Sequence, residues 1–328
     1  MTEVVVVTGA SAGVGRATIR EFARAGASLG LIARGHEGLQ GARRDVEQLG
    51  SRACVVQADI ADHEQVEAAT ERIEAELGPI DIWINNAMAT ILAPVSEIGP
   101  DEFRRATEVT YLGSVWGTMV ALRRMRPRDR GTIVQVGSAL AYRGIPLQAP
   151  YCGAKHALQG FLESLRVELL HEHANIHVTM VQLPALNTPQ FTWARTRMPR
   201  NPRPVPPIFQ PEVAAQAIFW AAHNPRRELM IGWPTVIAIL GNAVIPGLAD
   251  RYLARSGYDA QQTDESVEPN RRDNLFEPVD EDRGAHGLFD DQAKEHSVQA
   301  VLSRHRGSLG LGVLASTMAL GFVRGIRR

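Results

Sequence analysis

The sequence predicts an α/β protein in which helices flank a doubly wound parallel sheet of about seven strands, followed by a C-terminal extension. Over about the first 235 residues, short apolar runs rich in Val and Ile alternate with amphipathic segments. Such runs are typical of strands buried on both faces of a parallel sheet. A glycine-rich loop also joins the first run to the first helical pattern. Right-handed crossovers then place a ligand site beyond the carboxyl ends of the strands.

Six runs are the expected strands, over residues 4–7, 29–33, 53–57, 80–84, 132–136 and 177–181. Helical patterns lie between them, for example over residues 61–77 and 101–125. Asp62 is expected to cap the first of these helices, and Asp101 follows Gly99-Pro100, a strong signal for the start of the second. Strands that alternate with helices in this way predict βαβ units.

Composition narrows the classes of protein and site. The 328 residues are 45% hydrophobic and 22% charged, an ordinary balance for a globular domain. A formal net charge of -1 gives no field that would favour nucleic acid. Two cysteines, Cys54 and Cys152, are too few for a disulfide framework, and no metal spacing is seen. No secretory signal precedes the first apolar run, so a cytoplasmic location is expected.

The segment 186–211 interrupts the alternation with seven prolines. Because proline lacks a backbone donor, we expect a long loop without regular structure over the carboxyl edge of the sheet. Two interpretations stay open, a simple tether and a substrate lid. The position directly after the last core strand favours the lid.

The C-terminal extension covers residues 236–328, and an apolar segment leads into it over residues 233–248. Residues 255–303 are polar and are expected to be disordered in part or to wrap the surface. An apolar terminal helix is expected over about residues 307–323, followed by arginines. This helix would pack on the protein or a second subunit, or anchor the chain at a membrane surface; disorder is the third alternative.

The glycine-rich loop between the first strand and the first helix has the pattern of a phosphate-binding turn. Gly9 permits a tight turn, while Gly13 and Gly15 let the backbone approach a pyrophosphate at the helix N-terminus. At the tip of the second strand, Ala33 cannot accept from a ribose 2′-hydroxyl, whereas Arg34 can pair with a 2′-phosphate. The sequence therefore favours NADP(H) over NAD(H), unless Arg34 is merely a solvated cation.

A catalytic group is expected where the fifth strand and the following helix meet. Tyr151 and Lys155 are four residues apart and share one helical face. An ammonium beside a phenol stabilises the phenolate and lowers its pKa, which suits the phenol to proton transfer. Ser138 follows the strand over residues 132–136, where its hydroxyl would bind the substrate oxygen.

Together these motifs resemble the short-chain dehydrogenase/reductase family over roughly residues 1–235. Residues 8–15 match its TGxxxGxG loop, residues 85–88 match its NNAG segment with Met88 in place of Gly, and Ser138, Tyr151 and Lys155 match its catalytic residues. The resemblance implies a Rossmann-type fold and hydride transfer between NADP(H) and a carbonyl or secondary alcohol. The cofactor residues expected from the loop and from the resemblance are Thr8, Gly9, Ser11, Ala12, Gly13, Val14, Gly15, Arg34, Asp59, Ile60, Asn86, Ala87, Lys155, Pro184 and Thr188.

Two positions depart from the family pattern. Thr110 stands where members often carry a fourth catalytic residue, Asn, so it is included as a participant in the proton relay. Met88 would narrow the space near the cofactor or simply pack. The alternatives to an enzyme are a non-catalytic dinucleotide-binding or regulatory protein and a membrane-recruited assembly protein.

The expected partners follow from the resemblance and from the tail. A small-molecule carbonyl or alcohol substrate is expected, and a lipophilic one if the tail contacts a membrane peripherally. The helices over residues 101–125 and 151–170 pair across subunits in many relatives, so a homo-oligomer, a dimer or tetramer, is expected. 

Overall fold

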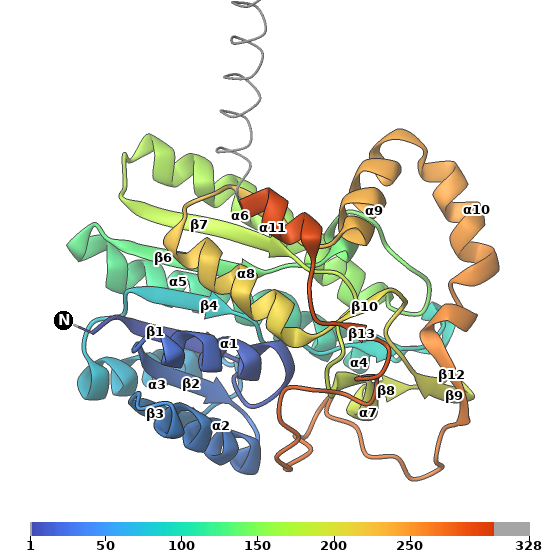
Figure 1. The fold of residues 1–328 in the computed structure, drawn as a ribbon, viewed down its shortest axis with the longest axis horizontal. Helices are drawn as coiled ribbons and strands as arrows, with labels where there is room; N and C mark the ends of the chain where they lie inside the picture. Colours follow the sequence, from blue (N-terminus) through green and yellow to red (C-terminus); the bar gives the residue numbers. More distant parts are fainter. Residues whose placement is uncertain (1, 305–328) are drawn as a thin grey trace, which may run out of the picture.

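A computed structural model describes residues 2–304 of the chain, so the terminal helix expected over about residues 307–323 lies outside the described residues. The described chain forms three layers, with a seven-stranded sheet between two groups of helices (Figure 1). The strand order is β11-β7-β6-β4-β1-β2-β3, and every pair of neighbours is parallel. These strands are β1 (Val4–Thr8), β2 (Ser28–Ala33), β3 (Ala53–Gln57), β4 (Ile82–Asn85), β6 (Gly131–Val136), β7 (Ile176–Gln182) and β11 (Glu228–Met230). The predicted fold class is confirmed.

Helices cover both faces of the sheet, which explains the uninterrupted apolar run of β1. Val5 and Val7 pack into one core cluster and Val4 and Val6 into the other, so successive side chains point to opposite faces. On the first face lie α1 (Gly13–Arg24), α2 (His36–Gln48) and α8 (Pro211–His223). On the second lie α3 (His63–Leu77), α4 (Pro100–Thr107), α5 (Gly113–Met125) and α6 (Ala149–His171).

Two local predictions for the helices have different outcomes. The Asp62 cap is confirmed, because its carboxylate accepts from the backbone N–H groups of Glu64 and Gln65 at 2.9 and 3.2 Å. The single helix expected over residues 101–125 is instead α4 and α5 joined by one π-helical turn, Glu108–Leu112. Such turns insert an extra residue into a helix and are frequent near functional sites.

The proline-rich segment 186–211 contains short regular elements, so the expectation of a loop without them is wrong. They are α7 (Gln190–Trp193), β8 (Arg195–Thr196), β9 (Arg200–Pro202) and β10 (Ile208–Phe209). Each strand pairs with a distant segment: β8 with β5 (Ile91–Leu92), β9 with β12 (Gln262–Ser266) and β10 with β13 (Ala293–Lys294). Strands this short need few backbone donors, which the residues other than proline supply.

The described part of the C-terminal extension follows the surface of the α/β domain. It begins with α9 (Trp233–Val244) and α10 (Pro246–Ser256), which project together from one end of the sheet (Figure 1). The polar chain then passes across the carboxyl edge of the sheet to β13 and ends in α11 (Val298–Arg304). In the described part of the chain, four 3₁₀ turns complete the secondary structure: Val95–Glu97, Arg126–Arg128, Ala139–Ala141 and Asp259–Gln261. Within residues 2–304, none of the helices is both long and apolar enough to cross a membrane.

Candidate active site

Two adjoining cavities lie at the carboxyl edge of the sheet, where the strand order reverses between β1 and β4. The glycine-loop cavity lies along the loop after β1 and the tip of β2. The tyrosine cavity lies beyond β6 and is lined by Tyr151. Residues that line both cavities include Val14, Asn86, Met88 and Thr188, so a long ligand in one cavity reaches the other.

The glycine loop is shaped by close backbone contacts. Gly9 has φ +66°, and a Cβ atom on Gly15 would lie 2.1 Å from the carbonyl oxygen of Gly9. Neither position therefore tolerates a side chain without distortion. Thr8 Oγ1 accepts from the N–H groups of Asn86 and Ala87 at 3.0 and 3.1 Å. Thr8 and Gly15 thus shape the cavity without lining it, and the first turn of α1 faces it with N–H groups that lack intrahelical partners.

The tip of β2 carries Arg34 into the lining of the glycine-loop cavity. Its guanidinium donates to three consecutive carbonyl oxygens of the extension, those of Asn274, Leu275 and Phe276, the last at 2.8 Å. Burial, together with the nearby cation of Arg105, lowers the pKa of Arg34. Arg34 is therefore not a solvated surface cation.

The side chains of Ser138, Tyr151 and Lys155 converge on the tyrosine cavity. The β6 strand ends just before Ser138, and α6 carries the other two. Lys155 is buried, donates to the carbonyl oxygen of Val136 at 2.7 Å and lies 5.4 Å from the centroid of the Tyr151 ring. The four-residue spacing on α6 thus brings ammonium and phenol together.

Burial is the main cause of the pKa shifts of Lys155 and Tyr151. Burial lowers the pKa of Lys155 to about 7, because no carboxylate compensates the charge. Burial also raises the pKa of Tyr151, while a hydrogen bond with Ser138 acts in the opposite direction. The expected lowering of the Tyr151 pKa by Lys155 is therefore wrong for the cofactor-free protein: the phenol keeps its proton at neutral pH and is available as a donor.

Thr110, included above as a participant in the proton relay, does not line either cavity. It is buried in the π-helical turn, where its hydroxyl donates to the carbonyl of Ala89 at 2.9 Å and accepts from the N–H of Ala89 at 3.0 Å. A hydroxyl has a single proton to donate, and this one is used. Thr110 therefore holds the segment after β4, and its part in the proton relay stays a prediction.

The remaining expected residues lie at the cavities. Asp59 lines the glycine-loop cavity and pairs with Arg105. Around that cavity the structure also brings together Gly9, Ser11, Ala12, Gly13, Val14, Arg34, Ile60, Asn86, Ala87 and Thr188, while Pro184 lies at the tyrosine cavity. Within residues 2–304 no group of three or more His, Cys, Asp or Glu side chains is arranged to hold a metal ion.

Sequence reasoning missed the contribution of the extension to both cavities. Residues of α10 and the turn after it line the tyrosine cavity, namely Tyr252, Leu253, Ser256, Gly257, Ala260 and Gln261. Residues further along line the glycine-loop cavity, namely Asn274, Pro278, Val279 and Glu281. The isolated apolar residues within the polar segment 255–303 could have indicated that it packs on the domain, but they have no periodicity that predicts where.

Comparisons with known proteins agree with this geometry. The family model described as short chain dehydrogenase matches residues 3–198. The uncharacterized oxidoreductase YxnA of Bacillus subtilis is 32% identical over 278 residues, covering 84% of this chain and 78% of that protein. The 3-dehydrosphinganine reductase of Danio rerio is 31% identical over 222 residues, covering 65% of this chain and 66% of that protein. 

A solved structure extends the comparison to the fold. The short-chain alcohol dehydrogenase of Sinorhizobium meliloti superposes with a TM-score of 0.53 at 30% identity, covering 56% of this chain and 72% of that chain. Oxidoreductases of this family bind a nicotinamide dinucleotide and act on a small-molecule substrate. With its sheet order, glycine loop and Tyr-Lys spacing, the chain belongs to the short-chain dehydrogenase family.

Proposed function

We propose that the protein is an NADP(H)-dependent oxidoreductase that interconverts a carbonyl and a secondary alcohol on a lipophilic substrate. One observation carries the proposal: Ser138, Tyr151 and Lys155 line a mostly apolar cavity that adjoins the glycine-loop cavity. A dinucleotide lying along the first turn of α1 therefore has its reactive end beside these three side chains. The two close approaches at Gly9 and Gly15 fit a backbone shaped to approach phosphate.

Each side chain has a distinct part in the proposed mechanism. The bound nicotinamide supplies or accepts the hydride. Tyr151 gives a proton to the substrate oxygen during reduction, and its raised pKa keeps the phenol protonated at neutral pH until that step. Ser138 donates a hydrogen bond to that oxygen, and Lys155 lies close enough to Tyr151 to stabilise the phenolate left behind.

Two observations support NADP(H) as the cofactor. Ala33 leaves the tip of β2 without a carboxylate that would accept from a ribose 2′-hydroxyl. Arg34 has five N–H donors, and three face carbonyl oxygens, so two remain for a 2′-phosphate. Arg105 adds a second cation at this end, partly neutralised by Asp59.

A lipid surface is proposed as a peripheral partner. On α9 and α10 the exposed side chains include Trp233, Ile237, Leu240, Val244 and Leu248. This apolar face continues into the tyrosine cavity, because Pro234, Ala238 and Tyr252 of the same helices line it. Gln299 of α11 accepts from the N–H of Gly232 at 2.6 Å, so α11 lies beside the start of α9. A lipophilic substrate would enter the cavity directly from the lipid.

Binding to vesicles tests this surface. The double variant Ile237→Asp/Leu240→Asp is expected to lose co-sedimentation with phosphatidylcholine–phosphatidylserine vesicles, because burying two carboxylates in lipid is unfavourable. Val95→Asp, at another exposed apolar position, is the control. Equal sedimentation of all three proteins would remove the basis for this partner.

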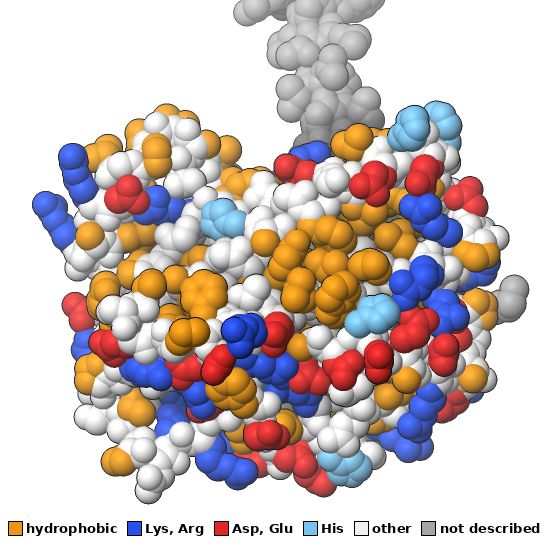
Figure 2. All heavy atoms as spheres, turned by 180° about the vertical axis from the view of Figure 1, so that it is seen from behind, with side chains coloured by type: hydrophobic (Ala, Val, Ile, Leu, Met, Phe, Trp, Pro, Cys, Tyr) orange, Lys and Arg blue, Asp and Glu red, His pale blue; other side chains and the backbone are white. Residues whose placement is uncertain are grey.

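A homo-oligomer is proposed through the face formed by α4, α5 and α6. Figure 2 shows hydrophobic side chains gathered near the middle of this face. Exposed apolar residues there include Phe103, Met119, Val167 and Leu170. Light scattering after size exclusion is expected to give a dimer or tetramer that Val167→Arg weakens. A monomeric parent would contradict the proposal.

The enzymatic proposal is tested by binding first and turnover second. Fluorescence titration is expected to show tighter binding of NADPH than of NADH, and Arg34→Ala is expected to reduce this preference. With a panel of apolar ketones, Tyr151→Phe is expected to lower kcat by about 10²- to 10⁴-fold, the range for a lost acid–base group, while binding NADPH like the parent. If Tyr151→Phe turned over substrate like the parent, the proposed role of Tyr151 would be wrong. If the parent bound NADPH but reduced no ketone, a non-catalytic dinucleotide-binding role would replace the proposal.

A further inference from the structure

Part of the extension runs along the glycine-loop cavity and forms one of its walls. We call residues 274–284 the strap. Asn274, Pro278, Val279 and Glu281 of the strap line this cavity together with the glycine loop. The wall therefore comes from a segment beyond the part of the chain matched by the family model.

The first half of the strap is bound to the tip of β2 and the start of α2. Its carbonyl oxygens at Asn274, Leu275 and Phe276 accept from Arg34, and that of Leu275 also accepts from Nε of Arg105 at 3.1 Å. These contacts hold the Arg34 guanidinium in one orientation beside the cavity. Asp280 caps α2, because its carboxylate accepts from the N–H of Glu37 at 2.8 Å.

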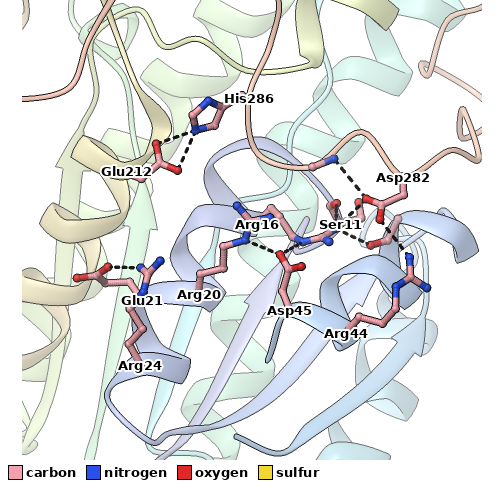
Figure 3. Close-up of polar contacts among 12 residues, drawn as sticks. Ser11, Arg16, Arg20, Glu21, Arg24, Arg44, Asp45, Glu212, Asp282 and His286 are labelled. Carbon is pink, nitrogen blue, oxygen red and sulfur yellow. Dashed lines mark hydrogen bonds and ion pairs between the residues drawn. The ribbon is translucent and has the colours of Figure 1, made fainter. Parts of the chain in front are cut away.

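The second half of the strap is bound to α1 and α2, as Figure 3 shows. Asp282 pairs with Arg16 at 3.0 Å and with Arg44 at 3.3 Å. Arg16 also pairs with Asp45 at 2.8 Å, so this buried guanidinium keeps a partner if Asp282 is removed. A Cβ atom on Gly41 would lie 1.9 Å from a carboxylate oxygen of Asp282, so the strap approaches α2 only because residue 41 is glycine.

The end of the strap reaches the backbone of the glycine loop itself. The carbonyl oxygen of Gly284 accepts from the N–H of Gly13 at 3.0 Å. Just beyond it, His286 contacts Glu212 of α8 at 3.0 Å, and Gly287 donates to the carbonyl oxygen of Asn187 at 3.3 Å. The strap is thus attached on both sides of the cavity, and a dinucleotide lying along α1 would be enclosed beneath it.

The charges of the strap are compatible with an anionic ligand. It carries four carboxylates: Asp280 accepts from a helix N-terminus, Asp282 is paired with two arginines, Glu281 is paired with Arg283, and the charge of Glu277 acts on the Arg34 cation. Their charge is therefore largely neutralised within the protein. The group at this wall that suits a phosphate is the Arg34 cation, which the strap holds in place.

We propose that the strap is part of the cofactor site: it encloses the adenosine and pyrophosphate half of the dinucleotide, positions Arg34 and limits the rate of cofactor release. This proposal rests on the proposed function, which supplies the ligand. A cofactor enclosed in this way leaves only after the contacts of Asp282 and Gly284 have opened.

The test measures NADPH release by stopped-flow fluorescence, with excess NADP⁺ to prevent rebinding. In the full chain, Asp282→Ala is expected to speed release by about three- to tenfold, the effect of losing two partly exposed ion pairs, with Arg16 and with Arg44. Gly41→Ala is expected to act in the same direction, since its methyl group displaces the Asp282 carboxylate. Asp264→Ala, another acidic residue of the extension with an exposed side chain, is the matched control and is expected to release NADPH like the parent.

Limited proteolysis supplies a readout that does not depend on a variant. Bound NADPH is expected to slow tryptic cleavage after Arg283, because the enclosed ligand keeps the strap closed. The proposed role of the strap would be wrong if Asp282→Ala and Gly41→Ala both released NADPH at the parent rate, or if NADPH did not change the rate of cleavage after Arg283. Either result would leave the proposed function intact. A parent protein that binds neither NADPH nor NADH would instead refute the proposed function, and the strap proposal with it.

Discussion

Replacing Lys155 with Met in the cofactor-free protein should change how the free energy of unfolding depends on pH. Burial lowers the pKa of Lys155 from its ordinary value of 10.5 to about 7 in the folded protein. Between these values the unfolded chain binds more protons than the folded one, so the parent gains stability as pH rises. The gain is about 1.4 kcal/mol per pH unit, or about 2 kcal/mol between pH 7 and pH 9. Met has no proton to lose and lacks this gain.

The assay is urea unfolding of both cofactor-free proteins at pH 7, 8 and 9. Other groups that titrate in this range, such as the two buried thiols, are the same in both proteins and cancel in the difference. We expect the difference in unfolding free energy, parent minus Lys155→Met, to grow more favourable to the parent by about 2 kcal/mol over the range. A difference that stays constant, or that changes in the opposite direction, would show that Lys155 is not desolvated in the free protein.

Three further outcomes are expected. Because bound phosphate and ribose favour the charged ammonium of Lys155, the affinity for NADH should fall as pH rises above about 7 in the parent but not in Lys155→Met. A parent affinity that does not change with pH would exclude a link between NADH binding and protonation of Lys155. Thr110→Val should cost about 1–3 kcal/mol of stability, because it leaves the backbone groups of Ala89 unpaired. The variant should keep the parent KM for substrate. A selective loss of kcat would show that Thr110 takes part in the proton relay. Hydrogen bonds from Arg197, Gly99 and Arg195 lower the pKa of Glu102 to about 2. Glu102→Gln should therefore be less stable than the parent above pH 4.5, and the difference in unfolding free energy should shrink toward pH 2. Equal acid-unfolding profiles of the two proteins would contradict this pKa shift.

The sequence was most informative where one physical requirement acts on neighbouring residues. Burial on both faces makes β1 a run of valines, and a close backbone approach requires Gly9 and Gly15, so sheet and loop were both predictable. The helical repeat likewise places Tyr151 and Lys155 on one face of α6. By contrast, β11 has three residues, one of them Glu228, and carries no pattern that distinguishes it from a loop.

The parts that sequence reasoning missed depend on contacts between distant segments. The strap binds through backbone carbonyls and carboxylates, and such contacts leave no periodicity in its sequence. The orientation of Arg34 comes from three carbonyl oxygens about 240 residues further along the chain. The contacts of Thr110 were missed for a related reason: its partner is the backbone of Ala89, and backbone partners have no residue-type signature.

The place of the strap in the chain also affects how the protein folds. Arg16 and Asp282 are 266 residues apart, so their pairing closes nearly the whole described chain into one loop. The entropic cost of closing a loop grows with its length, and contacts of this kind form late. At the usual rate of synthesis, the glycine loop leaves the ribosome on the order of tens of seconds before the strap does. Between the synthesis of Trp193, the last lining residue before the strap, and that of the strap, the nascent chain has an uncovered nucleotide site, so cofactor is free to enter before the last wall is in place.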